Sequence, residues 1–190
     1  LLDAAVTEGT AELRRVLPAS LGKASNGHPM LVNGVNLLLC LLHGSEAPFD
    51  QEAAMNKAEK FTQTKHPLWE RSVVACLLAL LQRDIERFSQ SLEDVRRSFG
   101  RERCAKYMRL QCLNGYGLAV LAHDLLSEED FRRVRLPEGP SFSPAYLHNQ
   151  PHIRRFFFQN RLVCARIQIL KYRFFPGSVH PNTGKPHPYD

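Results

Sequence analysis

The sequence predicts an all-α fold in which antiparallel helix pairs stack side by side, as in an α-solenoid, with a step of 38 residues. The first observation is a weak repeat: His28-Pro29 opens one apolar helical run, and His66-Pro67 opens the next. Further matches at this offset are Leu39 with Leu77, Leu42 with Leu80, Phe61 with Phe99, and Leu80 with Leu118. The second observation is that no alternating run of β-branched residues indicates a strand. Repeats of this size are typical of stacked helix pairs, because one pair cannot bury its apolar face alone.

Apolar residues at three- and four-residue spacing predict about seven to nine helices. The expected helices cover residues 2–17, 30–42, 51–61, 68–82, 85–98, 101–126, a short segment from 127, and 151 to about 174. Pro29 and Pro67 stand at helix starts, where a missing backbone amide has no cost. Asp50, Asp84 and Ser127 are each placed to cap the helix that follows. The first repeat helix is almost wholly apolar, so we expect it to be central.

The register of the repeat makes a specific prediction about the core. We expect Leu39, Leu77 and Leu118 to occupy related surroundings, each on the buried side of a stacked helix. The predicted helix over 101–126 contains Asn114-Gly115-Tyr116-Gly117, and each glycine within a helix costs about 1 kcal/mol relative to alanine. Either the helix kinks at this patch or a neighbouring backbone packs very close to it.

Composition favours one folded domain. The chain has 190 residues, of which 44% are hydrophobic and 23% charged, and these values exclude a disordered protein. We expect a single helical domain over residues 1–175 and an irregular tail rich in proline and glycine over 176–190. The longest apolar run, Val73 to Leu81, is shorter than the about 20 residues that cross a membrane, so we expect a soluble protein. The chain begins with Leu1 and not Met, so we expect further residues before it.

Candidate residues for chemistry are few. The five cysteines show no CxxC spacing, which predicts buried free thiols in a reducing compartment. The sequence has no glycine-rich phosphate loop, HExxH or GxSxG motif, so we predict no catalytic residue, no cofactor and no metal. We interpret His28 and His66 as structural residues at helix starts. His123 and Asp124 are adjacent on a helix and point about 100° apart, so we predict that they form no catalytic pair. An enzyme with a site near residues 114–117 is the least favoured function.

The net charge of +6 belongs to the C-terminal segment. The first 149 residues hold 18 basic and 18 acidic side chains, whereas residues 150–190 hold seven basic side chains and one acidic one. On the predicted last helix, Arg155, Arg166 and Arg173 fall within about 20° of one another. The basic face and its aromatic neighbours give the predicted partner-binding residues, which are Arg154, Arg155, Phe158, Arg161, Arg166, Tyr172 and Arg173.

Such a face suits an anionic partner, either an acidic protein surface or single-stranded nucleic acid. An equally weighted interpretation is a solvated face whose charges pair with Glu128, Glu129 and Asp130. Of the two anionic partners, single-stranded nucleic acid is less favoured than an acidic protein surface, because the rest of the domain is neutral.

The segment His66 to Ser98 reads HPLWERSVVACLLALLQRDIERFSQSLEDVRRS. A tryptophan precedes a helix rich in Ala and Leu, then Arg-Asp, then a second amphipathic helix. This layout resembles the all-helical immunity proteins of bacterial polymorphic-toxin and contact-dependent secretion systems, which are similar to tetratricopeptide-like folds. The resemblance implies a cytoplasmic protein that binds a cognate toxin directly and has no catalytic residues. The basic charge departs from the acidic character common in immunity proteins against nucleases, and suits a toxin with an acidic surface.

These observations together predict a protein-binding module, an immunity protein that neutralises a cognate secreted toxin. The predicted partner is therefore the toxin, and no membrane partner is expected. The alternative is a nucleic-acid-binding helical module that uses the basic C-terminal helix.

Overall fold

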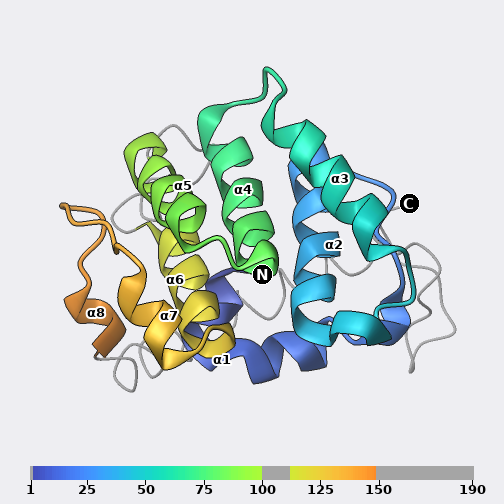
Figure 1. Cartoon of the computed structure of the whole chain (residues 1–190), viewed down its shortest axis with the longest axis horizontal. Helices are drawn as coiled ribbons and strands as arrows, with labels where there is room; N and C mark the ends of the chain where they lie inside the picture. Colours follow the sequence, from blue (N-terminus) through green and yellow to red (C-terminus); the bar gives the residue numbers. More distant parts are fainter. Residues whose placement is uncertain (1, 100–111, 149–190) are drawn as a thin grey trace, which may run out of the picture.

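A computed structural model of the chain describes residues 2–99 and 112–148, and within these ranges the regular structure is helical throughout, with no strand (Figure 1). The α-helices are α1 (Leu2–Val16), α2 (Pro29–His43), α3 (Gln51–Thr62), α4 (Leu68–Gln82), α5 (Ile85–Ser98), α6 (Leu113–Leu125), α7 (Glu128–Arg133) and α8 (Ala145–His148). Two short 3-10 turns, η1 (Ala19–Leu21) and η2 (Gly44–Glu46), follow α1 and α2. The all-α prediction is confirmed. The predicted domain boundary at residue 175 and the tail after it lie outside the described residues.

The two repeat units form antiparallel helix pairs that stack on each other. Helix α2 pairs with α3 and α4 pairs with α5, and α4 packs against both helices of the first pair. Helices α2 and α4 run in the same direction, so their N-terminal ends lie at one end of the molecule, beside the α3–α4 loop (Figure 1). The predicted arrangement of stacked pairs is therefore confirmed for α2 to α5.

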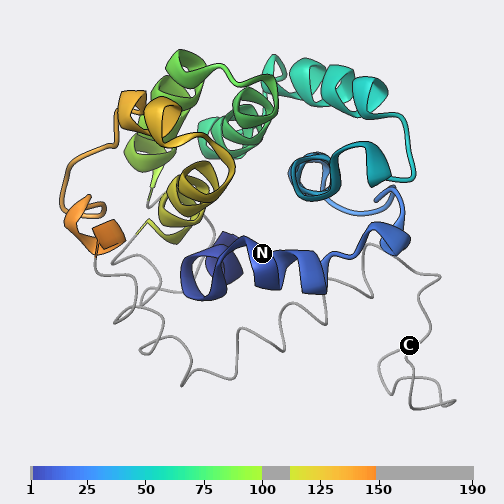
Figure 2. The same ribbon diagram turned by 60° about the horizontal axis from the view of Figure 1, so that its bottom comes forward.

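The third step of the repeat is built differently from the first two. Leu39, Leu77 and Leu118 are each at most 1% exposed and belong to one continuous core, as expected. However, α6 packs most extensively against α1 and only lightly against α4 and α5. Figure 2 shows α1 lying along one side of the molecule, across α6 and toward α2. The N-terminal helix thus covers the side of α6 that a further repeat would otherwise cover.

Helix α2 is central because its residues are apolar almost all round. Residues 32–40 are all buried, and they include the polar side chains of Asn33 and Asn36. Asn36 accepts a hydrogen bond from Ala24 N (2.8 Å) and donates one to Ala24 O (3.0 Å), so its buried amide is satisfied by the preceding loop. Asn33 donates to the carbonyl of Pro29, one turn earlier, at 2.9 Å.

The predicted caps are present. Asp50, Asp84 and Ser127 each accept a hydrogen bond from the backbone N–H three residues later, at 3.0, 3.0 and 3.1 Å. Among the thiols, Cys40 and Cys76 are buried and unbridged, and burial raises the pKa of the Cys76 thiol well above its ordinary value. The described helices include none that is long and apolar enough to cross a membrane.

The glycine patch of α6 is explained by close packing and not by a kink. The predicted helix over 101–126 is not continuous: α6 begins at Leu113, after the non-helical Cys112, and runs unbroken through both glycines to Leu125. A Cβ atom on Gly117 would lie 2.3 Å from the carbonyl oxygen of Leu2, so the α1 backbone crosses α6 at this point. Of the two predicted alternatives, the close approach of a neighbouring backbone is therefore the correct one.

We predict that Gly117→Ala destabilises the protein by about 1–3 kcal/mol, because the α1 backbone must move and this exceeds the gain in helix propensity. The matched control is Gly34→Ala in α2, where a Cβ would lie 3.8 Å from Leu77 Cδ1, an ordinary contact. We expect this control to be neutral or stabilising by up to about 1 kcal/mol. Urea denaturation measures the free energy of unfolding of both variants. Equal values for the two variants would contradict the close approach of the α1 backbone to Gly117.

Candidate functional site

The predicted partner-binding residues cannot be placed. Arg154, Arg155, Phe158, Arg161, Arg166, Tyr172 and Arg173 all lie outside the described residues. The acidic side chains that would neutralise them belong to α7, where Glu128 pairs with Arg132, and Asp130 lies 3.3 Å from Arg133. These two acids therefore already have cationic neighbours on their own helix.

A polar cluster that the structure does describe lies where α2 and α4 begin. It consists of His28, His66 and Glu70, and we call it the His–His–Glu cluster. His28 Nε2 lies 3.8 Å from Glu70 Oε1, and His66 Nδ1 lies 3.4 Å from Glu70 Oε2. The two imidazole rings are 6.2 Å apart between centroids, in an edge-to-face arrangement. One carboxylate is thus shared by two histidines that come from different helix pairs.

The repeat brings the two histidines together. His28 is the N-cap residue of α2, and Pro29 is the first residue of the helix. In the second copy Pro67 is the N-cap of α4, so His66 stands one residue further out. Because α2 and α4 are parallel neighbours, equivalent positions at their N-termini become neighbours in space.

Glu70 is the member of the cluster that sequence reasoning missed. It lies four residues after His66, a spacing that places two side chains on one helix face, and this was the available signal. The repeat did not reveal it, because the equivalent position in the first copy is Val32. The interpretation of both histidines as helix-start residues is confirmed, but it leaves out the carboxylate that they share.

Glu70 is unusually buried for an acidic residue. Only 7% of the residue is exposed, and Oε2 accepts no hydrogen bond from the described part of the chain. His66 Nδ1 approaches Glu70 Oε2 to 3.4 Å without forming a hydrogen bond with it. A buried acceptor without a donor is unfavourable by roughly 1–3 kcal/mol. An unsatisfied group of this kind calls for a physical reason.

The surroundings hold the cluster in place. The Phe61 ring, from α3, lies 4.7 Å from the His66 ring between centroids. Arg71 donates from Nε to the carbonyl of His66 (2.9 Å) and from Nη1 to the carbonyl of Thr62 (3.3 Å). The guanidinium is therefore engaged with the backbone of the α3–α4 connection.

The cluster has the chemistry of a proton acceptor and donor. Each imidazole forms an ion pair with Glu70 only when it is protonated, and histidine is the side chain that commonly changes charge between pH 5 and 8. In the described ranges, no group of three or more His, Cys, Asp and Glu side chains is arranged to hold a metal ion.

A second polar group lies between α1 and α6. Thr10 donates to Asp124 Oδ2 from its backbone N and from Oγ1, both at 3.2 Å. Gly9, with φ of 73°, breaks the helical geometry of α1, so Asp124 caps the second half of that helix.

The expectation that the side chains of His123 and Asp124 point away from each other is wrong. His123 Nδ1 lies 3.2 Å from Asp124 Oδ1, although adjacent positions on a helix diverge by about 100°. The divergence applies to the Cα–Cβ bonds, whereas the polar atoms are several rotatable bonds further out. That the two residues form no catalytic pair stays a prediction.

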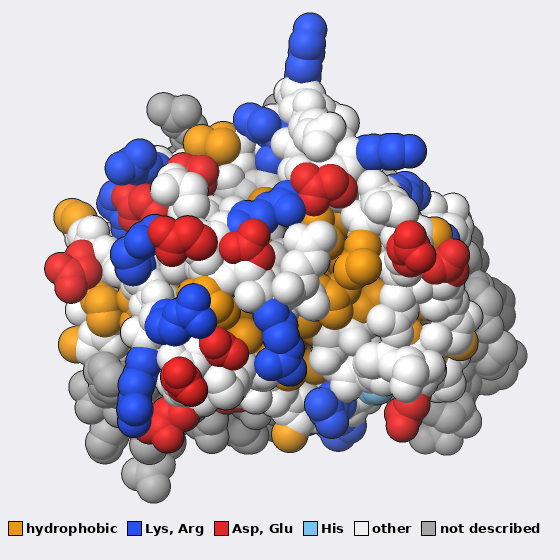
Figure 3. Space-filling model, in the orientation of Figure 1, with side chains coloured by type: hydrophobic (Ala, Val, Ile, Leu, Met, Phe, Trp, Pro, Cys, Tyr) orange, Lys and Arg blue, Asp and Glu red, His pale blue; other side chains and the backbone are white. Residues whose placement is uncertain are grey.

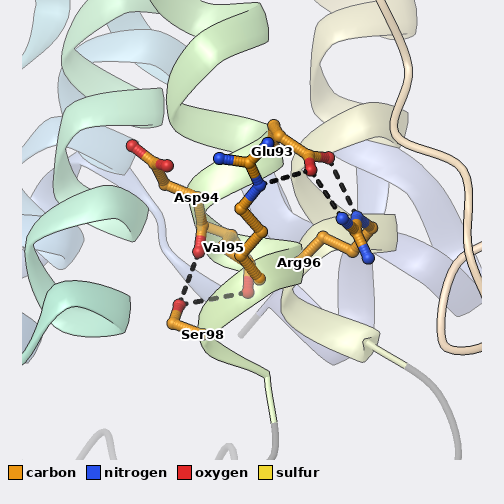
Figure 4. A network of polar contacts seen from close by, with 6 residues as sticks. Glu93, Asp94, Val95, Arg96 and Ser98 are labelled. Atoms are coloured by element: carbon orange, nitrogen blue, oxygen red, sulfur yellow. Dashed lines mark hydrogen bonds and ion pairs between the residues drawn. The ribbon is translucent and has the colours of Figure 1, made fainter.

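A third network lies on α5 and is structural. Glu93 accepts hydrogen bonds from two arginines. Arg96 Nε donates to Glu93 Oε2 at 2.9 Å (Figure 4), and Arg97 Nε donates to Glu93 Oε1 at 2.8 Å. Hydrogen bonds from Arg96 hold the pKa of the Glu93 carboxyl below its ordinary value of 4.5. A Cβ on Gly139 would lie 2.9 Å from Arg96 Nη1, so the arginine also packs under the turn after α7.

We predict that Glu93→Gln lowers the free energy of unfolding by about 0.5–1 kcal/mol at pH 7. Because folding lowers the pKa of Glu93, its contribution is present above pH 4.5 and is lost as the pH falls through the folded value. The difference between wild type and variant should therefore be smaller at pH 3 than at pH 7. Urea denaturation at both pH values measures it. Glu128→Gln, which removes a largely exposed pair on α7, is the control, and an equal loss there would contradict the prediction.

Comparisons of the chain with protein-family models, with curated proteins and with solved structures find no match. The functional assignment therefore depends on the residues and their arrangement.

Proposed function

We propose that this chain is a protein-binding module, and specifically an immunity protein that neutralises a cognate secreted bacterial toxin by direct binding. The α4–α5 hairpin is the observation that carries the proposal. It contains the segment from His66 to Ser98 whose sequence resembles helical immunity proteins, and it forms an antiparallel pair stacked on α2–α3. In this proposal the protein acts in the cytoplasm by occupying the toxin, without catalysis and without a cofactor.

The described surface supports recognition through charge. Leu68 is the exposed large hydrophobic residue among the described side chains, at 38% exposure. Figure 3 shows basic and acidic side chains intermixed over one face, with apolar side chains visible between the helices. A polar surface of this kind favours a partner that is selected by charge complementarity more than by apolar contact.

The charge distribution supports an acidic partner surface. Residues 1–149 are balanced, so the whole excess of +6 comes from residues 150–190. A basic segment accelerates encounter with an acidic surface and disfavours basic partners. We therefore assign the contact to the predicted basic arc, which includes Arg155, Arg166 and Arg173.

The proposal is tested by co-expression with the toxin domain encoded by the reading frame next to this gene. Growth of cells that carry both proteins, and arrest of cells that carry the toxin alone, is the expected result. Arrest in both cases, together with no binding between the purified proteins, would refute the immunity function.

We predict that reversing the charge of Arg155, Arg166 and Arg173 to Glu weakens toxin binding by about 100-fold, because three attractive contacts become repulsive. The control reverses Lys57, Lys60 and Lys65, three exposed residues on α3 and the following loop, which changes the net charge equally. Isothermal titration calorimetry measures the affinity, and thermal unfolding checks that both variants fold. Equal affinities of the two variants would remove the basic arc from the interface.

The alternative function is nucleic-acid binding, which the aromatic residues Phe158 and Tyr172 among the arginines favour. It requires affinity for a single-stranded oligonucleotide that falls steeply with salt. A filter-binding titration at 50 and 200 mM salt distinguishes the alternatives: a steep loss without protection from toxin favours nucleic acid, and no binding at either salt excludes it.

A further inference from the structure

The turn between α4 and α5 holds an arginine in a backbone conformation that arginine does not favour. Arg83 ends α4 with φ of 55° and ψ of 31°, in the left-handed region, and among the described residues it is the one non-glycine with positive φ. Arg83 N donates to Leu80 O at 3.2 Å and Asp84 N donates to Ala79 O at 2.9 Å, which is the hydrogen-bond pattern of a Schellman motif. Glycine is the usual residue at this position, because a Cβ atom makes the left-handed conformation unfavourable.

The Arg83 side chain gains no contact within the described residues that would offset this strain. The residue is exposed, and its guanidinium forms neither a hydrogen bond nor an ion pair with them. The two acids that follow it in the chain are engaged elsewhere. Asp84 accepts from Arg87 N at 3.0 Å as the cap of α5, and Glu86 pairs with Arg135 at 2.7 Å.

The other arginines of the two hairpins stabilise the fold. Arg87, Arg96 and Arg97 each form an ion pair with a glutamate, and Arg71 donates to two backbone carbonyls. Arg83 is therefore the arginine of residues 29–98 whose side chain serves no contact of the described fold. Strained backbone conformations are concentrated at residues that serve a function, which is a reason to look for a contact outside this part of the chain.

We propose that Arg83 is a contact residue for an acidic group on the protein partner and that the turn between α4 and α5 belongs to the binding surface. The inference rests on the proposed function: the partner is the same toxin with an acidic surface, and Arg83 adds a cationic contact outside the basic arc.

The chemistry of the side chain fits an acidic partner. A guanidinium presents its N–H donors in a planar fork that matches the two oxygens of a carboxylate. Because Arg83 has no ion pair with the described residues, a carboxylate of the partner displaces no described acid when it binds. The contact would therefore form without the loss of an ion pair within the described fold.

The test is Arg83→Gly, which should change stability and binding in opposite directions. Glycine relieves the left-handed strain, so the folding equilibrium constant, measured by urea denaturation, should rise about two- to fivefold. The same change removes the guanidinium, so the affinity for the toxin domain encoded by the neighbouring reading frame should fall about tenfold. Isothermal titration calorimetry measures that affinity.

Two further variants separate the side chain from the backbone and from net charge. Arg83→Ala also removes the guanidinium but keeps a Cβ atom, so it should lose the same affinity without the gain in stability. Arg14→Gln removes an exposed cation of α1 that likewise forms no ion pair with the described residues. It changes the net charge equally, and its affinity should stay within about twofold of wild type.

The outcomes distinguish this inference from the proposed function. If the wild type does not bind the toxin domain, the immunity function fails and the inference fails with it. If the wild type binds and Arg83→Gly binds equally well, the Arg83 contact is overturned while the immunity function stands. An equal loss of affinity in Arg14→Gln, or no gain of stability in Arg83→Gly, would also overturn the inference.

Discussion

The packing of α2 against α4 is the contact on which the rest of the structure depends. Helix α2 is apolar nearly all round, and it must be covered by α3 on one side and α4 on another. Leu37, Leu39 and Leu77 are almost fully buried in the resulting core. Burial of this apolar surface is the main favourable term in folding, and it forces the two hairpins to stack in parallel register.

The stacked register also determines where polar groups are brought together. Parallel neighbours place their N-termini side by side, so the two His-Pro motifs of the repeat meet, and Glu70 lies between them. The same packing leaves one carboxylate oxygen buried without a donor among the described residues. A stabilising apolar seam thus ends in a polar cluster whose interactions depend on the charge of its histidines, and this is the feature of the described fold that packing alone does not explain.

The charge of the chain is divided unevenly between its first 149 residues and the residues that follow. The balanced first 149 residues provide the helix pairs and their internal ion pairs, such as Arg87 with Glu59 across α5 and α3. The basic excess follows this scaffold and provides the charge that the proposed partner would meet. In the proposed immunity function, a neutral scaffold followed by a charged segment would let the proposed contact residues vary while the core and the helix contacts stay the same.

The sequence by itself determined the all-α class, the paired helices α2 to α5 and the three caps, because spacing of apolar residues and capping side chains act within a few residues. It also left two explanations for Gly117, a kink in the helix or the close approach of a neighbouring backbone. Only the tertiary structure decided that α1 crosses at Gly117, that α6 leaves the repeat, and that Glu70 is shared by two histidines. The contact of His28 with Glu70 and that of Leu2 with Gly117 join residues 42 and 115 positions apart, and local patterns carry no information on which distant surfaces meet.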